Sequence, residues 1–215
     1  MLFLSLSIRK RRLGYYAASV IVIALSALAS AFGPVMIGMA ALCLLFVLRP
    51  DEWKRNLGIT LSIGAFAYAI CAPFLAPSVI LAMRDSSTVT EGGWNTGSIT
   101  ALAAVAAGWT IVWRYMPRWT ADWPLQFFAL FAYLTTSIPF IAMFFHRQFL
   151  PQPGRYKNEM ELALSLLVVF AARKGLERTP VSVRAALVFL FLAIAGEQVV
   201  SHRKFAKNVF SRRTT

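Results

Sequence analysis

The sequence predicts an all-α protein built from membrane-spanning helices, and three observations lead to this fold class. Of its 215 residues, 58% are hydrophobic and only 14% are charged. Apolar runs of about 18 residues or more, long enough to cross a bilayer, recur along the whole chain. The lysines and arginines lie between these runs and at the chain ends, as the positive-inside rule expects. We therefore predict a polytopic transmembrane helix bundle of about seven spans.

The spans follow from the apolar runs and from the residues that separate them. One apolar run covers residues 15–48, and Phe32-Gly33-Pro34 lies at its centre, where a proline ends a helix and a glycine permits a turn. Basic clusters flank this run, so a hairpin with both ends in the cytoplasm fits better than one long helix. The predicted spans are residues 15–32, 34–48, 56–72, 99–113, 124–145, 160–172 and 185–200.

Three further segments complete the predicted organisation. Residues 1–8 are apolar but too short to span, so they form either a short interfacial start or the end of a helix whose beginning is missing. Residues 77–85 are apolar between prolines and closed by charges, which favours a short helix at the membrane surface, with a lipid-facing loop as the alternative. A basic tail, residues 201–215, follows the transmembrane domain of residues 1–200.

Aromatic residues near the fourth span predict a belt at the cytoplasmic headgroup level. A functional aromatic site is the less favoured alternative. The belt consists of Trp109, Trp113, Tyr115, Trp119 and Trp123.

Charge and cysteine content exclude several classes of function. The formal net charge of +13 could suggest a nucleic-acid partner, but the positive-inside pattern already explains where the cations lie. No nucleic-acid binding is therefore predicted. Cys43 and Cys71 both lie inside apolar runs, where cysteine behaves as a small hydrophobe, so the sequence indicates neither a disulfide nor a metal site.

The segment from His146 to Glu161 is the strongest candidate for a functional site. It packs ionisable residues between two apolar runs, and such residues are costly to place at the mouth of a membrane helix. Arg155 offers a planar fork of donors that suits a phosphate, and Lys157 and Arg147 add positive charge. The predicted topology, with a cytoplasmic N-terminus, places this segment on the external side of the membrane.

The acidic and titratable residues of the segment leave alternatives open. Glu159 could act as a general base or hold a metal if a partner acid exists, and His146 could titrate near neutral pH. In a helix Glu159 and Glu161 point about 200° apart, so both cannot face one pocket. Tyr156 and Glu159 share a face if the helix begins before Tyr156. The structural alternative is that Arg155 and Glu159, four residues apart, simply pair at a helix start.

The segment Gln152-Pro-Gly-Arg-Tyr-Lys-Asn-Glu-Met-Glu161 also carries a family resemblance. It resembles a group of bacterial polytopic proteins described as pyruvoyl-tetrahydropterin-synthase-related membrane proteins, which look like members of the GT-C superfamily. These are glycosyltransferases that use sugars linked to a lipid phosphate. In that group a Pro-x-Arg-Tyr-x-x-Glu-like element follows an external loop and opens a membrane helix, and Pro153, Arg155, Tyr156 and Glu159 occupy its positions here.

The resemblance implies a function and also shows a departure. It implies part of a glycosyltransferase of the bacterial inner membrane that binds a polyprenyl-phosphate-linked sugar, with an external domain after the last span. GT-C enzymes carry an acidic catalytic motif in their first external loop, which this chain lacks. We therefore expect a fragment that is inactive alone, with unknown catalytic residues, no metal site of its own and no cofactor, although the intact enzyme could hold a divalent metal.

The sequence also leaves a second function open. The alternative is a non-enzymatic membrane protein, either a piece of a transporter or a structural subunit. Charges that lie at the ends of spans argue against ion-coupled transport, which places ionisable residues near mid-membrane. The predicted substrate-binding residues are Arg155, Tyr156, Glu159, Lys157, His146 and Arg147.

Overall fold

A computed structural model gives the fold, and every element of regular structure in its described residues is a helix. The structure describes residues 2–30, 33–48, 50–78, 81, 96–147, 150, 152–177, 179–183, 185–186 and 189. The chain divides into two compact units, Met1–Phe170 and Ala171–Thr215. The all-α class predicted from the sequence is therefore observed over the described residues.

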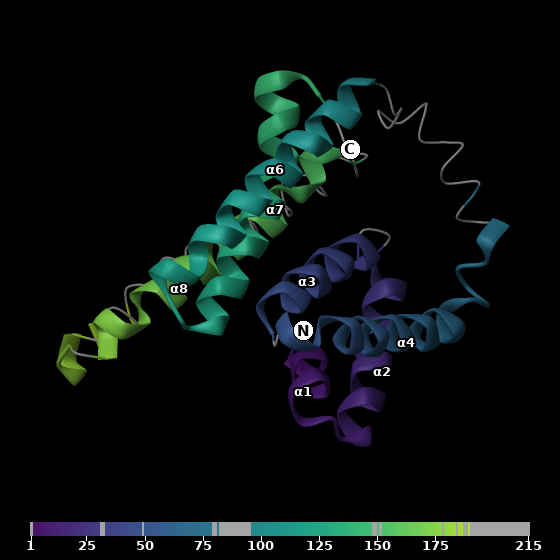
Figure 1. The fold of residues 1–215 in the computed structure, drawn as a ribbon, viewed down its shortest axis with the longest axis horizontal. Coiled ribbons are helices and arrows are strands. Elements are labelled where there is room, and N and C mark those ends of the chain that lie inside the picture. Colours follow the sequence, from purple (N-terminus) through teal and green to yellow (C-terminus); the bar gives the residue numbers. More distant parts are fainter. Residues whose placement is uncertain are drawn as a thin grey trace, which may run out of the picture. The chain divides into compact units, whose positions relative to one another are not determined.

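The helices keep the order of the apolar runs along the chain (Figure 1). Two 3-10 turns, η1 and η2, precede α4 and α8. The elements are α1 (Leu2–Lys10), α2 (Leu13–Ala29), α3 (Gly33–Val47), η1 (Pro50–Glu52), α4 (Trp53–Cys71), α6 (Thr96–Trp119), α7 (Trp123–Phe145), η2 (Pro153–Tyr156) and α8 (Lys157–Glu177).

Two of the described helices are long and apolar enough to cross a membrane, Gly97–Trp119 and Trp123–Phe145. The helices α2 and α3 are apolar but contain 17 and 15 residues. At about 1.5 Å per residue both are shorter than a hydrocarbon core of about 30 Å. They are two separate helices, divided at the glycine and proline that predicted a break, because α2 ends at Ala29 and α3 begins at Gly33.

Several helices extend beyond the predicted spans. The predicted 99–113 corresponds to α6, which continues through Arg114 and Pro117 to Trp119, and the predicted 160–172 corresponds to α8 at Lys157–Glu177. Hydropathy marks where side chains are apolar, whereas backbone hydrogen bonds continue through exposed charged residues. A hydropathy window therefore underestimates the length of a helix with charged ends.

Parts of the predicted organisation lie outside the described residues. Of the surface helix predicted at 77–85, only Pro77, Ser78 and Leu81 are described, and each is helical. Of the span predicted at 185–200, only residues 185, 186 and 189 are described. The basic tail at 201–215 lies wholly outside them.

The N-terminal segment is a packed helix. Leu4 and Ile8 of α1 are buried in the core shared with α3, α4, α6 and α7. Ser7 and Ser19 are also buried, and their hydroxyl oxygens lie 3.0 Å apart, which links α1 to α2. A hydrogen bond between small polar residues is a common means of helix association in an apolar environment. The segment is therefore docked against its neighbours through one face.

The contact between α2 and α4 is made of small side chains. Ala24, Ala67 and Cys71 form one buried cluster, and the Cys71 thiol donates to the carbonyl of Ala24 across 3.4 Å. Both cysteines of the chain, Cys43 and Cys71, are buried and free. They therefore act as packing residues, as their position in apolar runs indicated.

The helices α6 and α7 lie side by side as an antiparallel pair (Figure 1). Their close approach depends on Gly108, because a Cβ atom there would collide with the Tyr133 hydroxyl. That hydroxyl donates to the carbonyl of Val105 across 3.0 Å. Trp109, which the sequence assigned to the aromatic belt, instead belongs to the buried core and meets Phe46 edge to face.

Candidate functional site

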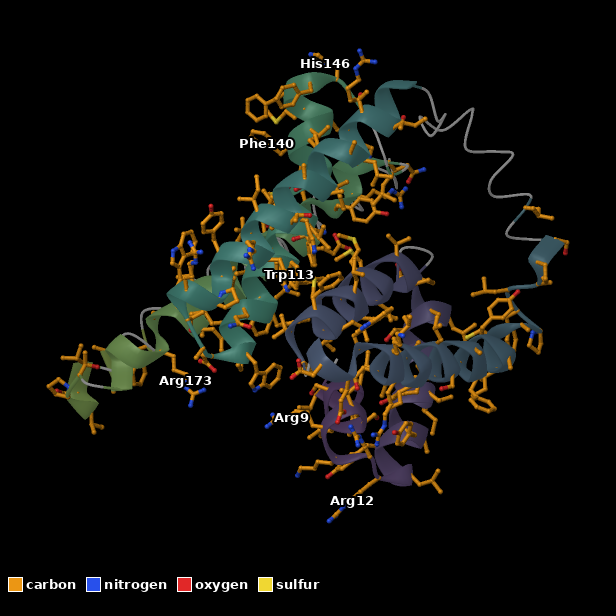
Figure 2. The ribbon with its side chains drawn as sticks, in the orientation of Figure 1. Arg9, Arg12, Trp113, Phe140, His146 and Arg173 are labelled. Carbon is orange, nitrogen blue, oxygen red and sulfur yellow. The ribbon has the colours of Figure 1, made fainter. Side chains whose placement is uncertain are left out.

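The candidate segment begins where α7 ends. His146 adopts a left-handed conformation with φ of 51°, which stops the helix after Phe145 and turns the chain away. Its imidazole is exposed at the end of α7 (Figure 2). A non-glycine residue in this conformation is uncommon, although histidine tolerates it better than most. His146 thus serves as the helix terminator and leaves its ring accessible to solvent.

A short turn, η2, then restarts the helical path. Gln152 has φ of 51°, and the carbonyl of Gln152 accepts the N–H of Arg155 at 3.0 Å. Pro153 occupies the first position of the turn, where its fixed φ is favourable and its missing N–H costs nothing. Pro153 is buried, and η2 packs against α7. The Pro-Gly-Arg-Tyr element therefore has a defined conformation beside the bundle.

Tyr156 fixes this turn to the helices. Its side chain is 1% exposed and packs among Ala101 and Val105 of α6 and Ile138 of α7, and partly buried α3 residues adjoin the same cluster. Burial of an aromatic side chain of this size is a large contribution to local stability. Tyr156 therefore lies beneath the surface of the loop, in a position that suits an anchor.

Burial of Tyr156 raises the pKa of its phenol above the ordinary value, and the nearby Glu159 carboxylate raises it further. Both causes oppose the phenolate, because an anion is disfavoured in an apolar site and beside a like charge. The phenol therefore stays neutral at physiological pH.

The cations of the segment lie at its surface. Arg155 and Lys157, the two residues that flank Tyr156, are both exposed. Arg147 is exposed as well, and its guanidinium covers Gly97 in the first turn of α6, where a Cβ atom would collide with it. The ends of α7 and η2 and the start of α6 thus present three cations on one end of the unit.

The two glutamates of the segment diverge, as helical spacing predicted. Glu159 is half-buried and Glu161 is exposed. Within the part of the chain that the structure describes, the buried Oε2 atom of Glu159 accepts no hydrogen bond. The alternative drawn from spacing, a pair of Arg155 with Glu159, is therefore not made through this oxygen.

The arrangement can bind an anion more readily than it can catalyse a reaction. Among the described residues there is no group of three or more His, Cys, Asp or Glu side chains that could hold a metal ion. Glu159 and Glu161 do not converge on one space, so they do not form an acid and base pair. Exposed guanidinium and ammonium groups at the end of an apolar bundle suit a phosphate that arrives from the membrane.

Sequence reasoning missed two features of this site. Gly97 lies outside the predicted span of residues 99–113, yet it belongs to the first turn of α6 and provides the space for Arg147. The burial of Tyr156 was also missed, because an isolated tyrosine between Arg155 and Lys157 resembles a surface residue. The signal in the sequence that could have indicated its burial is an aromatic residue placed between two cations, Arg155 and Lys157.

Comparisons with known proteins add no assignment to this chain. No family model matches it, and neither the curated proteins nor the solved structures contain a match.

Proposed function

We propose that this chain is a multi-pass protein of the bacterial plasma membrane, with about seven spans, a cytoplasmic N-terminus and an external 146–161 segment. The distribution of charge within the first unit supports this orientation. Arg9 lies at the end of α1, Lys54 at the start of α4 and Arg118 at the end of α6. If successive helices cross the membrane in opposite directions, these ends lie on one side and the candidate segment, after the end of α7, lies on the other. The end with the most cations is the cytoplasmic one by the positive-inside rule.

The distribution of side-chain size also supports a membrane environment. Many large apolar side chains are exposed on the described helices, including Ile21, Phe66, Ile111 and Val168, each more than half exposed. Many of the buried contacts are made by alanine, serine, threonine and cysteine. A soluble protein rarely exposes so much apolar surface, whereas small residues between helices and large ones toward lipid are typical of membrane bundles.

The proposed activity is the one that the family resemblance implies. The chain forms part of a GT-C-like glycosyltransferase, and its external segment binds the phosphate of a polyprenyl-phosphate-linked sugar. The observation that carries this proposal is the anchored turn: Tyr156 is buried in the bundle, and the exposed Arg155 and Lys157 flank it. Two cations held at the end of apolar helices match a lipid whose phosphate lies at the membrane surface.

In this proposal each residue of the segment has a limited role. Arg155 donates hydrogen bonds to the phosphate, and Lys157 and Arg147 add positive charge. Glu159 lies close to Tyr156 in sequence and orients the turn that carries Arg155. His146 lies at the edge of the proposed phosphate site. The catalytic acid comes from outside this segment, since Glu159 and Glu161 diverge.

The divergence of Glu159 and Glu161 also favours a second candidate function. A non-enzymatic subunit of a membrane assembly needs a cationic anchored turn to bind an anionic lipid, but it needs no paired carboxylates. Both the subunit and the enzyme would bind a lipid phosphate, but only the enzyme would transfer the sugar. Release of polyprenyl phosphate from a polyprenyl-phosphate sugar, measured on the protein in its native membrane, distinguishes them.

Binding of a polyprenyl phosphate, compared with the matched polyprenol, tests the phosphate contact directly. We expect the purified protein in detergent to bind the phosphate form more tightly. Arg155→Gln should weaken this binding about tenfold, because a hydrogen bond to a charged group contributes about 1.5–3 kcal/mol. Arg55→Gln, which removes the same charge at the opposite helix ends, is the matched control. Equal binding of polyprenol and polyprenyl phosphate would overturn the proposal.

The external position of the segment has its own test. A cysteine introduced at Gln152, in a variant without Cys43 and Cys71, should react with a membrane-impermeant thiol reagent added to intact cells. A cysteine at Arg12 should react only after the membrane is opened. Labelling of Arg12→Cys, and not of Gln152→Cys, in intact cells contradicts the proposed orientation.

A further inference from the structure

The helix ends opposite the candidate segment contain two adjoining cavities. The first, about 340 Å³, lies between α3, α6 and α7 and is lined by Phe46, Val47, Trp113, Arg114, Met116, Pro117, Gln126 and Leu130. The second, about 400 Å³, lies between α3, α4 and α6 and is lined by Leu42, Leu45, Phe46, Trp53, Leu57 and Trp113. Phe46 and Trp113 belong to both, so the two cavities share a wall.

The two cavities differ in chemistry. The first contains the Arg114 guanidinium and the Gln126 amide, whereas every residue that lines the second is apolar or aromatic. Within α3, Leu42 and Leu45 lie further from the charged end than Val47. Arg114 and Gln126 lie toward the charged helix ends, and both cavities also reach apolar residues further along the helices, Leu130 in the first and Leu42 and Leu45 in the second. A cationic rim that leads into an apolar interior matches the two halves of a phospholipid.

Further polar groups in the first cavity favour a headgroup. Pro117 has no N–H, so the Trp113 carbonyl lacks its usual helical donor one turn along α6. Gln126 donates one amide hydrogen to the Thr120 carbonyl at 2.7 Å and carries a second. A headgroup with hydroxyl groups can donate to the carbonyl, and its phosphate can accept from Arg114 and Gln126.

The surrounding charge favours an anionic lipid over a zwitterionic one. The described segments at these helix ends carry eight basic residues against three acidic ones. Of the acidic residues, Glu52 is paired with Arg11. The basic residues are Arg9, Lys10, Arg11, Arg12, Lys54, Arg55, Arg114 and Arg118, and the acidic residues are Asp51, Glu52 and Asp122.

Aromatic contacts give the shared wall a fixed geometry. Phe46 meets Trp113 edge to face, with ring centroids 5.3 Å apart, and meets Trp109 in the same way at 5.6 Å. Trp113 is drawn on α6 in Figure 2. Tryptophan at the boundary between headgroups and acyl chains is the preferred anchor in membrane proteins. Phe46 and Trp113 therefore lie at the level where the headgroup of a bound lipid would join its acyl chains.

We propose that these cavities bind one anionic phospholipid of the cytoplasmic leaflet, with its phosphate on Arg114 and one acyl chain along Phe46 and Trp113 into the apolar cavity. The larger cavity between α2, α3 and α4, about 460 Å³, has no charged residue in its lining and carries no comparable argument. Of these three cavities, the one between α3, α6 and α7 is lined by a charged residue, Arg114. The site is separate from the proposed polyprenyl-phosphate site and does not depend on it.

Native mass spectrometry of the full chain in detergent tests this proposal. The probes are phosphatidylglycerol and phosphatidylcholine with identical acyl chains, added in equal amounts. We expect one phosphatidylglycerol to be retained in preference to phosphatidylcholine. Equal retention of the two lipids by the unsubstituted protein would overturn the proposal without any variant.

Matched variants then locate the site. Arg114→Gln should weaken phosphatidylglycerol binding about fivefold, the effect expected for one cation near a lipid phosphate. Arg12→Gln removes the same charge from the same end but from outside both cavities, so it should leave binding unchanged. Leu45→Trp, which fills the apolar cavity, should weaken binding while Arg114 is intact. Equal losses in Arg114→Gln and Arg12→Gln would show a diffuse attraction and overturn the assigned site.

Discussion

At the helix ends where α6 begins and α7 ends, three cations stand on or beside one anchored turn, whereas at the opposite ends the cations are spread over several segments. The difference lies in the aromatic side chains beside the cations. Arg9 lies over the Trp123 ring at 5.4 Å and Arg118 over the Tyr115 ring at 5.1 Å. By contrast, Arg155 and Lys157 are exposed on either side of a buried tyrosine. The same residue types therefore serve two purposes.

A cation over the face of an aromatic ring is attracted to it, so the rings help to hold the side chains of Arg9 and Arg118 in place. Arg155 and Lys157 flank a turn whose anchor is the buried side chain of Tyr156. Cations of the same types therefore lie over aromatic rings at one set of helix ends and beside a buried tyrosine at the other. The following variants and conditions test this difference.

Removing the anchor should have the largest effect. Tyr156→Ala deletes a buried aromatic ring, which in protein cores costs about 3–5 kcal/mol, so the thermal transition of the protein in detergent should fall clearly. Tryptic cleavage after Arg155 and Lys157 should become faster. Tyr156→Phe keeps the ring and should change little, and Tyr115→Ala removes an exposed tyrosine at the opposite ends. If Tyr115→Ala destabilises the protein as much as Tyr156→Ala, Tyr156 is not a special anchor of its end of the bundle.

Alkaline pH should weaken the loop end through the same residue. The pKa of Tyr156 is raised in the fold, so the unfolded chain loses this proton first as pH rises. Stability from this group is therefore constant below about pH 10, the ordinary pKa of tyrosine, and decreases above it. The absorbance of phenolate is measured as pH rises in the unsubstituted protein and in Tyr156→Phe. The difference between the two curves gives the pH at which half of the Tyr156 side chains are ionised.

Glu159→Gln sharpens this titration because it removes the like charge that adds to the shift. The Tyr156 midpoint should move to lower pH, while burial still holds it above the ordinary value. A midpoint that stays in place or rises in Glu159→Gln would show that the carboxylate does not act on the phenol.

The ion pair at the opposite ends should contribute less. Arg11 pairs with Glu52, and their side chains are 27% and 37% exposed. An ion pair this accessible contributes about 0.2–1 kcal/mol, so Arg11→Gln should lower stability by no more than that, and salt should reduce the difference. Thermal unfolding at two salt concentrations measures it, with Arg12→Gln as the control for net charge. A loss several times larger would mean that this end depends on the pair.

The smallest effect is expected at Gly97. The atoms nearest to a Cβ there belong to the long, exposed side chain of Arg147, which can move aside, so Gly97→Ala should change stability by less than about 0.5 kcal/mol. Gly108→Ala is the matched comparison, because its Cβ would meet the hydrogen-bonded Tyr133 hydroxyl and overpacking costs about 1–3 kcal/mol. Equal effects at the two glycines would show that Arg147 is as firmly held as Tyr133.

The fold was more predictable from sequence than the site was. Apolar runs and the break near Pro34 predicted helices because hydrophobicity and proline chemistry act locally. Helix ends such as Trp119 of α6 were missed, since exposed charged residues can continue a helix. In the site, the opposed directions of Glu159 and Glu161 followed from helical geometry, whereas the burial of Tyr156 required the positions of α6 and α7.

The amino-acid sequence by itself determined that the described chain is helical, where its apolar segments lie and where its cations gather, because these depend on composition and on neighbours along the chain. Only the tertiary structure decided that Trp109 is core, that Tyr156 is an anchor and that Arg147 covers Gly97. Each of these contacts joins segments that are far apart in the sequence. Their packing is a property of helix pairs, and no local pattern of residues encodes which faces meet.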